Sequence, residues 1–67
     1  MENLKKALKE ANIKHSDISK KLNIKSLSTI SLKVNGKSSF TTKEASILKQ
    51  MINERSGKQY TIDYLFK

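Results

Sequence analysis

Apolar residues recur at helical spacing along most of this chain, and their pattern predicts about five short helices. The first stripe, at positions i, i+3, i+4 and i+7, consists of Leu4, Ala7, Leu8 and Ala11. Asn3 is suited to cap this helix and Asn12 to end it, because short amide side chains bond the exposed backbone groups at helix ends. The stripe is narrow, so the helix needs neighbours to bury it.

Two shorter helices are expected in the middle of the chain. The first covers Asp17 to Leu22, with Ile18 and Leu22 four residues apart on one face. The second covers Leu27 to Val34, and its apolar face consists of Leu27, Ile30 and Val34. Each helix therefore has a narrow apolar stripe and a larger polar surface.

The residues around these two helices predict a tight connection between them. Asn23 tolerates the left-handed conformation that closes a helix, and Ile24 is expected to point inward between the helices. Ser26 can cap the second helix through its hydroxyl group. Asn35-Gly36 should end that helix, since both residues accept positive φ.

The next helix is the longest and is expected to be the central one. Thr41 and Glu44 have the spacing of a capping box, so this helix should begin at Thr42 and end at Ser56-Gly57. Its apolar stripe is the widest in the chain and consists of Ala45, Ile47, Leu48, Met51 and Ile52. Phe40, which precedes the helix, is expected to enter the core.

The final segment carries three of the four aromatic residues. A short helix capped by Thr61 or a strand would both suit its pattern, and we favour the helix. Its apolar residues exceed what so small a core needs, so we predict a dimer contact formed by Tyr60, Ile62, Tyr64, Leu65 and Phe66. With no proline and two glycines, the chain is expected to be an all-α bundle of about five short helices.

Length and composition limit the remaining possibilities. Residues 1–67 suffice for one domain, and a core of this size supplies only about 3–5 kcal/mol of net stability. Cysteine is absent from the sequence, so disulfides and thiolate metal sites are excluded and oligomerisation is the stabilising device that remains. Neither a membrane span nor a signal peptide is recognisable, and a cytoplasmic location is expected.

The chain carries a formal net charge of +8. Residues 14–37 hold six lysines against one acidic residue, Asp17, which is a net charge of 6 − 1 = +5. This concentration of charge suits attraction to phosphates. Thirteen of the fourteen basic residues are lysine, however, and a genome poor in G and C produces the same bias, so charge alone does not decide the function.

The middle of the chain resembles the helix-turn-helix of the phage Cro and repressor family. The similarity lies in Ile18-Ser19-x-x-Leu22-Asn23-Ile24, in Ser28-Thr29-Ile30-Ser31 and in Asn35-Gly36-Lys37, and extends over residues 4–66. Two positions depart from the family, which usually has Ala at Ser19 and Gly at Asn23, and the turn is one residue longer. The resemblance implies a bacteriophage repressor or Cro-like transcription regulator that binds operator DNA in a bacterial host cell.

Such a regulator places its second helix in the major groove. The residues expected to contact base edges are Ser26, Ser28, Thr29, Ser31, Leu32 and Lys33. The residues expected to contact phosphates are Lys14, His15, Ser16, Lys20, Lys25 and Lys37. One short helix reads too few base pairs for a useful site, so a homodimer on double-stranded DNA is expected, formed either in solution or only on DNA.

The same residues leave alternative functions open. The fold would equally serve a protein-interaction modulator that binds another repressor, or a small antitoxin. An enzyme is not expected, because His15 is the only histidine and the serine-rich 26–31 segment has no reason to face it. A metal or other cofactor is not expected either, since one histidine without cysteine or clustered carboxylates makes no metal site.

Overall fold

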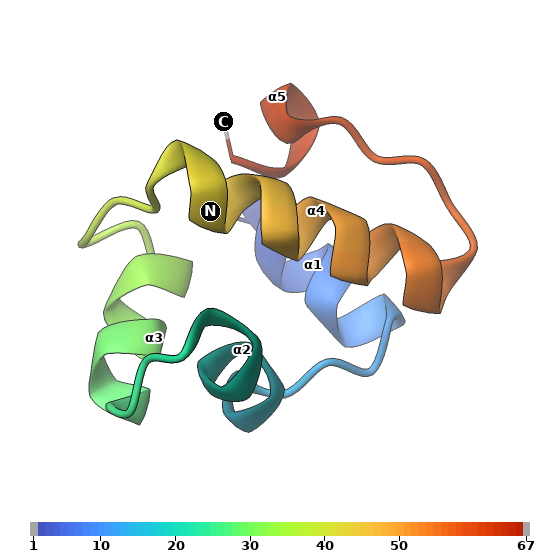
Figure 1. Cartoon of the computed structure of the whole chain (residues 1–67). Coiled ribbons are helices and arrows are strands. Elements are labelled where there is room, and N and C mark those ends of the chain that lie inside the picture. The colour runs from blue at the N-terminus through green and yellow to red at the C-terminus, as the bar shows by residue number, and fades with distance from the viewer. Residues whose placement is uncertain (1, 67) are drawn as a thin grey trace.

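The computed structural model describes residues 2–66, which form five helices and no strand (Figure 1). The helices are α1 (Glu2–Glu10), α2 (His15–Leu22), α3 (Leu27–Val34), α4 (Thr42–Ser56) and α5 (Ile62–Leu65). The all-α prediction is confirmed. None of the helices within this range combines the length and apolar character that crossing a membrane would require.

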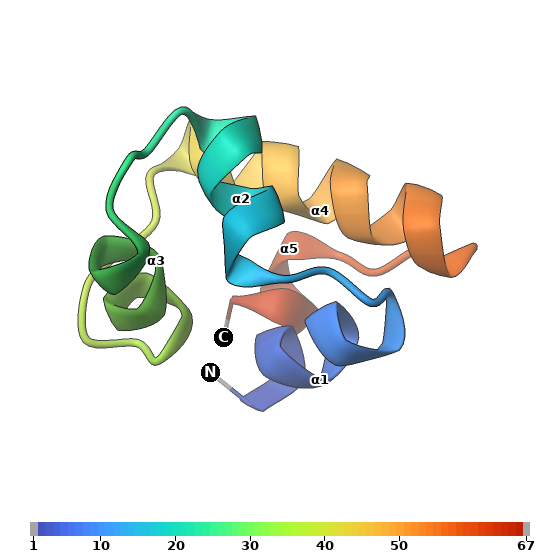
Figure 2. The ribbon, with the colours of Figure 1, turned by 90° about the horizontal axis from the view of Figure 1, so that it is seen from below.

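Helix α4 runs through the middle of the molecule and separates two groups of elements. In Figure 1, α5 lies on one side of α4 and the α2–α3 pair lies on the other. The view from below shows α3 at one edge of the molecule, next to α2 (Figure 2). Among the helices, α3 packs mainly on α2, whereas α1 packs on both α4 and α5. One face of α3 is therefore left without a neighbour.

A single hydrophobic core joins all five helices. The largest fully buried side chains are Leu4, Ile18, Ile30, Leu48, Ile52 and Leu65. They come from α1, α2, α3, α4, α4 and α5, respectively, so each helix contributes at least one. Because the apolar stripe of α4 meets the stripes of its neighbours, the predicted central role of this helix is confirmed.

Local side chains set the ends of the last two helices as predicted. The Thr41 hydroxyl accepts from the Glu44 N–H at 3.1 Å, and the Glu44 carboxylate accepts from the Thr41 N–H at 3.0 Å. Gly57 ends α4 at φ 72°, in the left-handed region. The Thr61 hydroxyl caps α5 by accepting from the Tyr64 N–H at 3.1 Å, which confirms a helix rather than a strand in this segment.

Two helix starts differ from the prediction. Helix α1 already includes Asn3, whose amide is not a cap but donates to the Tyr64 carbonyl at 2.9 Å and so links the two ends of the chain. Helix α2 begins two residues before Asp17, because the Asp17 carboxylate accepts from the Lys14 N–H at 3.0 Å and makes Lys14 the capping residue. Asn12 lies after α1 at φ 56°, as expected of a residue that ends a helix.

The C-terminal segment is mostly core, and its predicted role as a dimer contact needs correction. Leu65 is 0% exposed, because α5 packs against both α1 and α4. Tyr60 and Phe66 are partly buried against the same core. The sequence pattern underestimated how far these C-terminal residues are buried, because in so small a domain the core lies close to every helix. Ile62 and Tyr64 are not part of this core, and Tyr60 and Phe66 keep part of their surface exposed.

Candidate nucleic-acid interface

The connection between α2 and α3 is held by Ser19 and Asn23. Asn23 adopts φ 57° and ψ 40°, the left-handed conformation predicted for it. The Ser19 carbonyl accepts from the N–H groups of Asn23 and Ile24, and the Ser19 hydroxyl donates to the Ile24 carbonyl. Ile24 itself packs against the core. These bonds give the four-residue connection a defined shape, and they fix where α3 begins.

Helix α3 has one buried face and one face directed to solvent. Ile30 is 0% exposed and Val34 is 2% exposed. Leu27, which was predicted to share this buried face, is instead 52% exposed. It lies in the first turn of α3, and burial of the helix begins only one turn later, at Ile30. The prediction for Leu27 was therefore wrong, and the apolar face of α3 is shorter than its sequence indicates.

The predicted base-contacting residues differ in accessibility. Ser26, Ser28 and Leu32 are exposed, whereas Thr29 and Ser31 are half-buried. The Ser26 hydroxyl caps α3 by accepting from the Thr29 N–H at 3.3 Å. Ser31 receives hydrogen bonds from the Asn35 side-chain amide at its carbonyl and its hydroxyl. The freely accessible side chains therefore concentrate on the outer side of α3 and at its first turn.

Lys33 was also predicted to contact bases, and the structure corrects this. Its ammonium group donates to the Glu44 carboxylate at 2.9 Å and to the Ser39 carbonyl at 3.1 Å. Its side chain is only 12% exposed, and the nitrogen lies 5.6 Å from the centre of the Phe40 ring. Lys33 thus ties the end of α3 to the start of α4 and is turned away from the outer face. Glu44 lies eleven residues from Lys33 in sequence, so helical periodicity could not predict this pair.

The Glu44 carboxylate makes the stability of the domain depend on pH. Hydrogen bonds from the Thr41 N–H and the Lys33 ammonium hold the pKa of Glu44 below its ordinary value of 4.5. A lowered pKa in the folded state adds stability above the ordinary value, and this stability is lost as the pH falls through the lowered pKa. Glu44→Gln is expected to remove about 1 kcal/mol at pH 7 and progressively less as the pH falls below 4.5, measured by urea unfolding. A loss that does not change with pH would contradict the assignment.

Basic residues flank both ends of α3. Lys25 is exposed just before the helix and Lys37 just after it. The exposed start of α2, comprising Lys14, His15 and Ser16, also lies near the end of α3, since His15 and Val34 line the same surface hollow. Lys25 and Lys37 therefore flank α3, and His15 lies near its C-terminal end.

Lys20 is the predicted phosphate contact that the fold does not bring to this group. It lines a different hollow with Asp17, Lys21 and Arg55, between α2 and the C-terminal half of α4. Lys25 and Lys37 lie in the connections that adjoin α3, whereas Lys20 lies within α2. Its place beside α4 could not be deduced from spacing, because it depends on how α2 packs on α4.

The hollow beside His15 contains two lysines that the sequence pattern did not single out. Lys5 and Lys9 line it from α1, together with Leu8, Asn12 and Ile13. They are four residues apart and so share the polar side of α1, and this spacing is the sequence feature that could have identified them. Lys6 lies between them in sequence but near Glu10, whose pKa is lowered mainly by the hydrogen bond from Lys58 and to a smaller extent by Lys6.

Few acidic residues occur in the part of the sequence that surrounds α3. Six lysines and no acidic residue occur over residues 18–43. The acids that border this stretch are paired, Asp17 with Arg55 at 3.7 Å and Glu44 with Lys33 at 2.9 Å. The positive potential near α3 is therefore not cancelled by neighbouring carboxylates.

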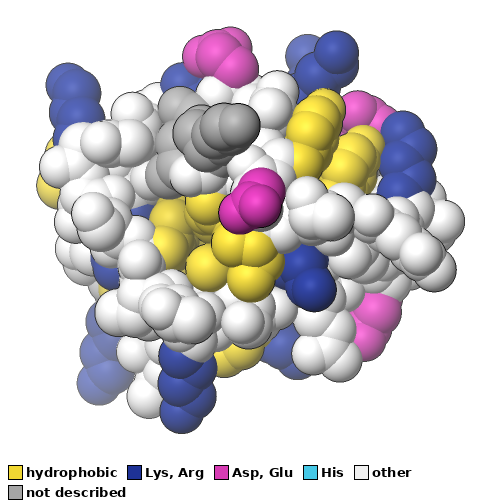
Figure 3. Space-filling model, turned by 90° about the horizontal axis from the view of Figure 1, so that it is seen from above, with side chains coloured by type: hydrophobic (Ala, Val, Ile, Leu, Met, Phe, Trp, Pro, Cys, Tyr) yellow, Lys and Arg dark blue, Asp and Glu magenta, His cyan; other side chains and the backbone are white. Residues whose placement is uncertain are grey.

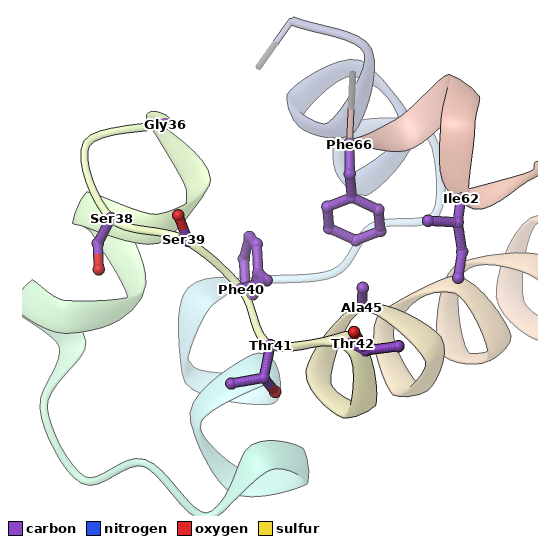
Figure 4. Close-up of a pocket in the computed structure, with 9 residues that line it drawn as sticks. All are labelled: Gly36, Ser38, Ser39, Phe40, Thr41, Thr42, Ala45, Ile62 and Phe66. Atoms are coloured by element: carbon purple, nitrogen blue, oxygen red, sulfur yellow. The ribbon is translucent and has the colours of Figure 1, made fainter.

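A separate hollow lies between the α3–α4 loop, the start of α4 and α5. Phe40 and Phe66 face each other in it, edge to face, with ring centres 5.3 Å apart (Figure 4). Seen from the side that carries α5, hydrophobic side chains reach the surface only in small groups among polar ones (Figure 3). Such small groups give no single broad apolar face on this side of the molecule.

Comparison of the chain with protein-family models, with curated protein sequences and with solved structures yields no match. The interpretation of the α3 surface therefore rests on its own residues and geometry.

Proposed function

We propose that this chain is a sequence-specific DNA-binding transcription regulator in which α2 and α3 form a helix-turn-helix. The observation that supports this best is the outer face of α3. It is accessible, it carries hydroxyl groups, and it is flanked by exposed lysines in a stretch without acidic residues. A short helix of this kind fits the major groove, with phosphates bound on either side of it.

The proposed roles follow from where each side chain lies. Ser26 and Ser28 are placed to meet base edges from the first turn of α3. Lys25 and Lys37 would bind phosphates at the two ends of the helix. The start of α2 adds the exposed His15. The phosphate contacts supply affinity, and the α3 side chains supply preference for sequence.

A homodimer on DNA remains part of the proposal. Two reading helices on one face of the duplex must lie about 34 Å apart. The molecule measures 28 × 21 × 19 Å, so two neighbouring copies can span this distance. Of the predicted contact residues, Leu65 is fully buried, and the exposed parts of the others remain available for this role: Tyr60, Ile62, Tyr64 and Phe66. Sedimentation of the free protein and of its DNA complex measures the stoichiometry.

A gel shift with the purified protein and the DNA upstream of its own gene tests the function. A shift that survives an excess of unrelated duplex supports a sequence-specific regulator. If the shift requires a second protein, the chain is instead an interaction modulator of another regulator. If neither DNA nor a DNA-bound partner is recognised, the proposal is wrong.

The basic hollow on α1 gives a prediction with a matched control. Lys5→Gln combined with Lys9→Gln is expected to weaken binding to all duplexes alike and to reduce the salt slope by about 2 per subunit. Lys6→Gln changes the same residue type on the same helix but lies beside Glu10, so it should leave the slope nearly unchanged. The measurement is the dissociation constant at several salt concentrations. If each of the three substitutions lowered the salt slope equally, binding would depend only on the net charge of the protein.

A further inference from the structure

Two leucines stand out on the surface of α3. Leu27 is 52% exposed and Leu32 is 46% exposed, and they are two of the three large hydrophobic side chains that are exposed within residues 2–66. Leu32 lies opposite the buried Ile30–Val34 face, and Leu27 lies at the first turn of the helix. Both leucines thus belong to the surface that the proposed function assigns to DNA.

The remaining side chains of α3 offer little to distinguish one base from another. Strong bidentate contacts to guanine or adenine come from Arg, Lys, Asn or Gln. Helix α3 carries only Lys33 from this group, and Lys33 is bonded to Glu44 and Ser39. Serine hydroxyls both donate and accept, so they discriminate weakly. A further source of sequence preference is needed.

The major groove contains one apolar group, the 5-methyl group of thymine. We infer that Leu27 and Leu32 bind thymine methyl groups, so that the duplexes preferred by this protein carry thymines at two positions within the reach of α3. This inference rests on the proposed function and names the chemistry of its preferred site. At a rise of about 1.5 Å per residue, the five residues from Leu27 to Leu32 span about 7.5 Å along the helix. Two base-pair steps span about 6.8 Å, so the two thymine positions lie about two steps apart.

The surroundings of these leucines favour DNA over a protein partner. Exposed Lys25 and Lys37 flank them, and the nearest acidic residues in sequence are paired with Arg55 and Lys33. A polyanion with apolar groups in a groove complements this arrangement of charge and apolar surface. A protein partner is the other possible occupant, and replacing thymine methyl groups in the duplex separates the two.

The operator sequence does not have to be known for the test. A preferred duplex is selected from a pool of random duplexes and is then resynthesised with deoxyuridine in place of every thymidine, which removes only the methyl groups. Burial of one such group corresponds to about fourfold in affinity, so the two groups met by each subunit should make the unchanged protein bind the uridine duplex about 15-fold more weakly per bound subunit. Leu27→Ala combined with Leu32→Ala should weaken binding to the thymidine duplex by about 15-fold per bound subunit and should no longer distinguish the two duplexes.

Gln50→Ala is the control, because Gln50 is exposed on α4 and belongs neither to the surface assigned to DNA nor to the predicted dimer contact. Its ratio of affinities for the thymidine and uridine duplexes should equal that of the unchanged protein. Equal binding of both duplexes by the unchanged protein would overturn the inference while leaving the proposed function intact. The inference would also be overturned if the double leucine variant still distinguished the thymidine duplex from the uridine duplex as well as the unchanged protein does. The same holds if that variant lost self-association while its ratio of affinities for the two duplexes stayed unchanged. Failure to select any duplex would overturn the proposed function and this inference together.

Discussion

Raising the salt concentration from about 50 to about 200 mM is expected to weaken DNA binding by at least about a thousandfold. Each phosphate neutralised by a lysine contributes about −0.9 to the slope of log K against log salt. With four or more basic groups engaged on each of two subunits, the slope should exceed a magnitude of about 5. Fluorescence anisotropy with a labelled duplex at four or five salt concentrations measures it.

Two variants show whether the slope arises from the surface around α3. Lys25→Gln combined with Lys37→Gln removes the exposed charges at the two ends of α3 and should lower the slope by about 2 per subunit. Lys49→Gln removes one charge beside Asn53, Tyr60 and Ile62, away from α3, and should leave it unchanged. A nearly flat dependence in the unchanged protein would exclude the phosphate-contact model.

Leu48→Ala is expected to unfold most of the protein at 25 °C. Leu48 is 0% exposed at the centre of the core, and replacing a buried leucine with alanine costs about 2–5 kcal/mol. A domain of this size has only about 3–5 kcal/mol of net stability. Circular dichroism during urea unfolding should therefore show a midpoint close to zero denaturant, or no folded baseline at all.

Leu27→Ala is the matched control, since it makes the same chemical change on α3. Leu27 is 52% exposed, so its replacement should alter the free energy of unfolding by no more than about 0.5 kcal/mol. A large loss from Leu27→Ala would mean that this side chain packs more tightly in solution than the structure shows. A small loss from Leu48→Ala would contradict the assignment of α4 as the central helix.

Much of the fold could be predicted because helix ends depend on neighbouring residues. The Thr41 and Glu44 capping box, the left-handed Asn23 and the Thr61 cap all involve bonds within about four residues. Such contacts are encoded in short stretches of sequence. Helical periodicity likewise identified the stripe of α4, because residues three and four apart share a face in every helix.

The candidate site could be predicted only in part. The sequence identified α3 and its flanking lysines, but it placed Leu27 in the core and Lys33 at the bases. Periodicity shows which side chains share a face, and it does not show how far a neighbouring helix covers that face. How much of the Leu27 side chain is covered depends on where α2 ends beside α3. The position of the Lys33 side chain depends on the approach of Glu44, which is eleven residues away.

The sequence by itself determined the helices, their caps and the concentration of positive charge between Asp17 and Glu44. These properties depend on residue type and short-range spacing. Only the tertiary structure decided that Leu65 belongs to the core, that Lys5 and Lys9 join His15 in one hollow, and that Leu27 is exposed. Each of these depends on the packing of helices that are distant in sequence, because burial is a property of the surface that two elements share.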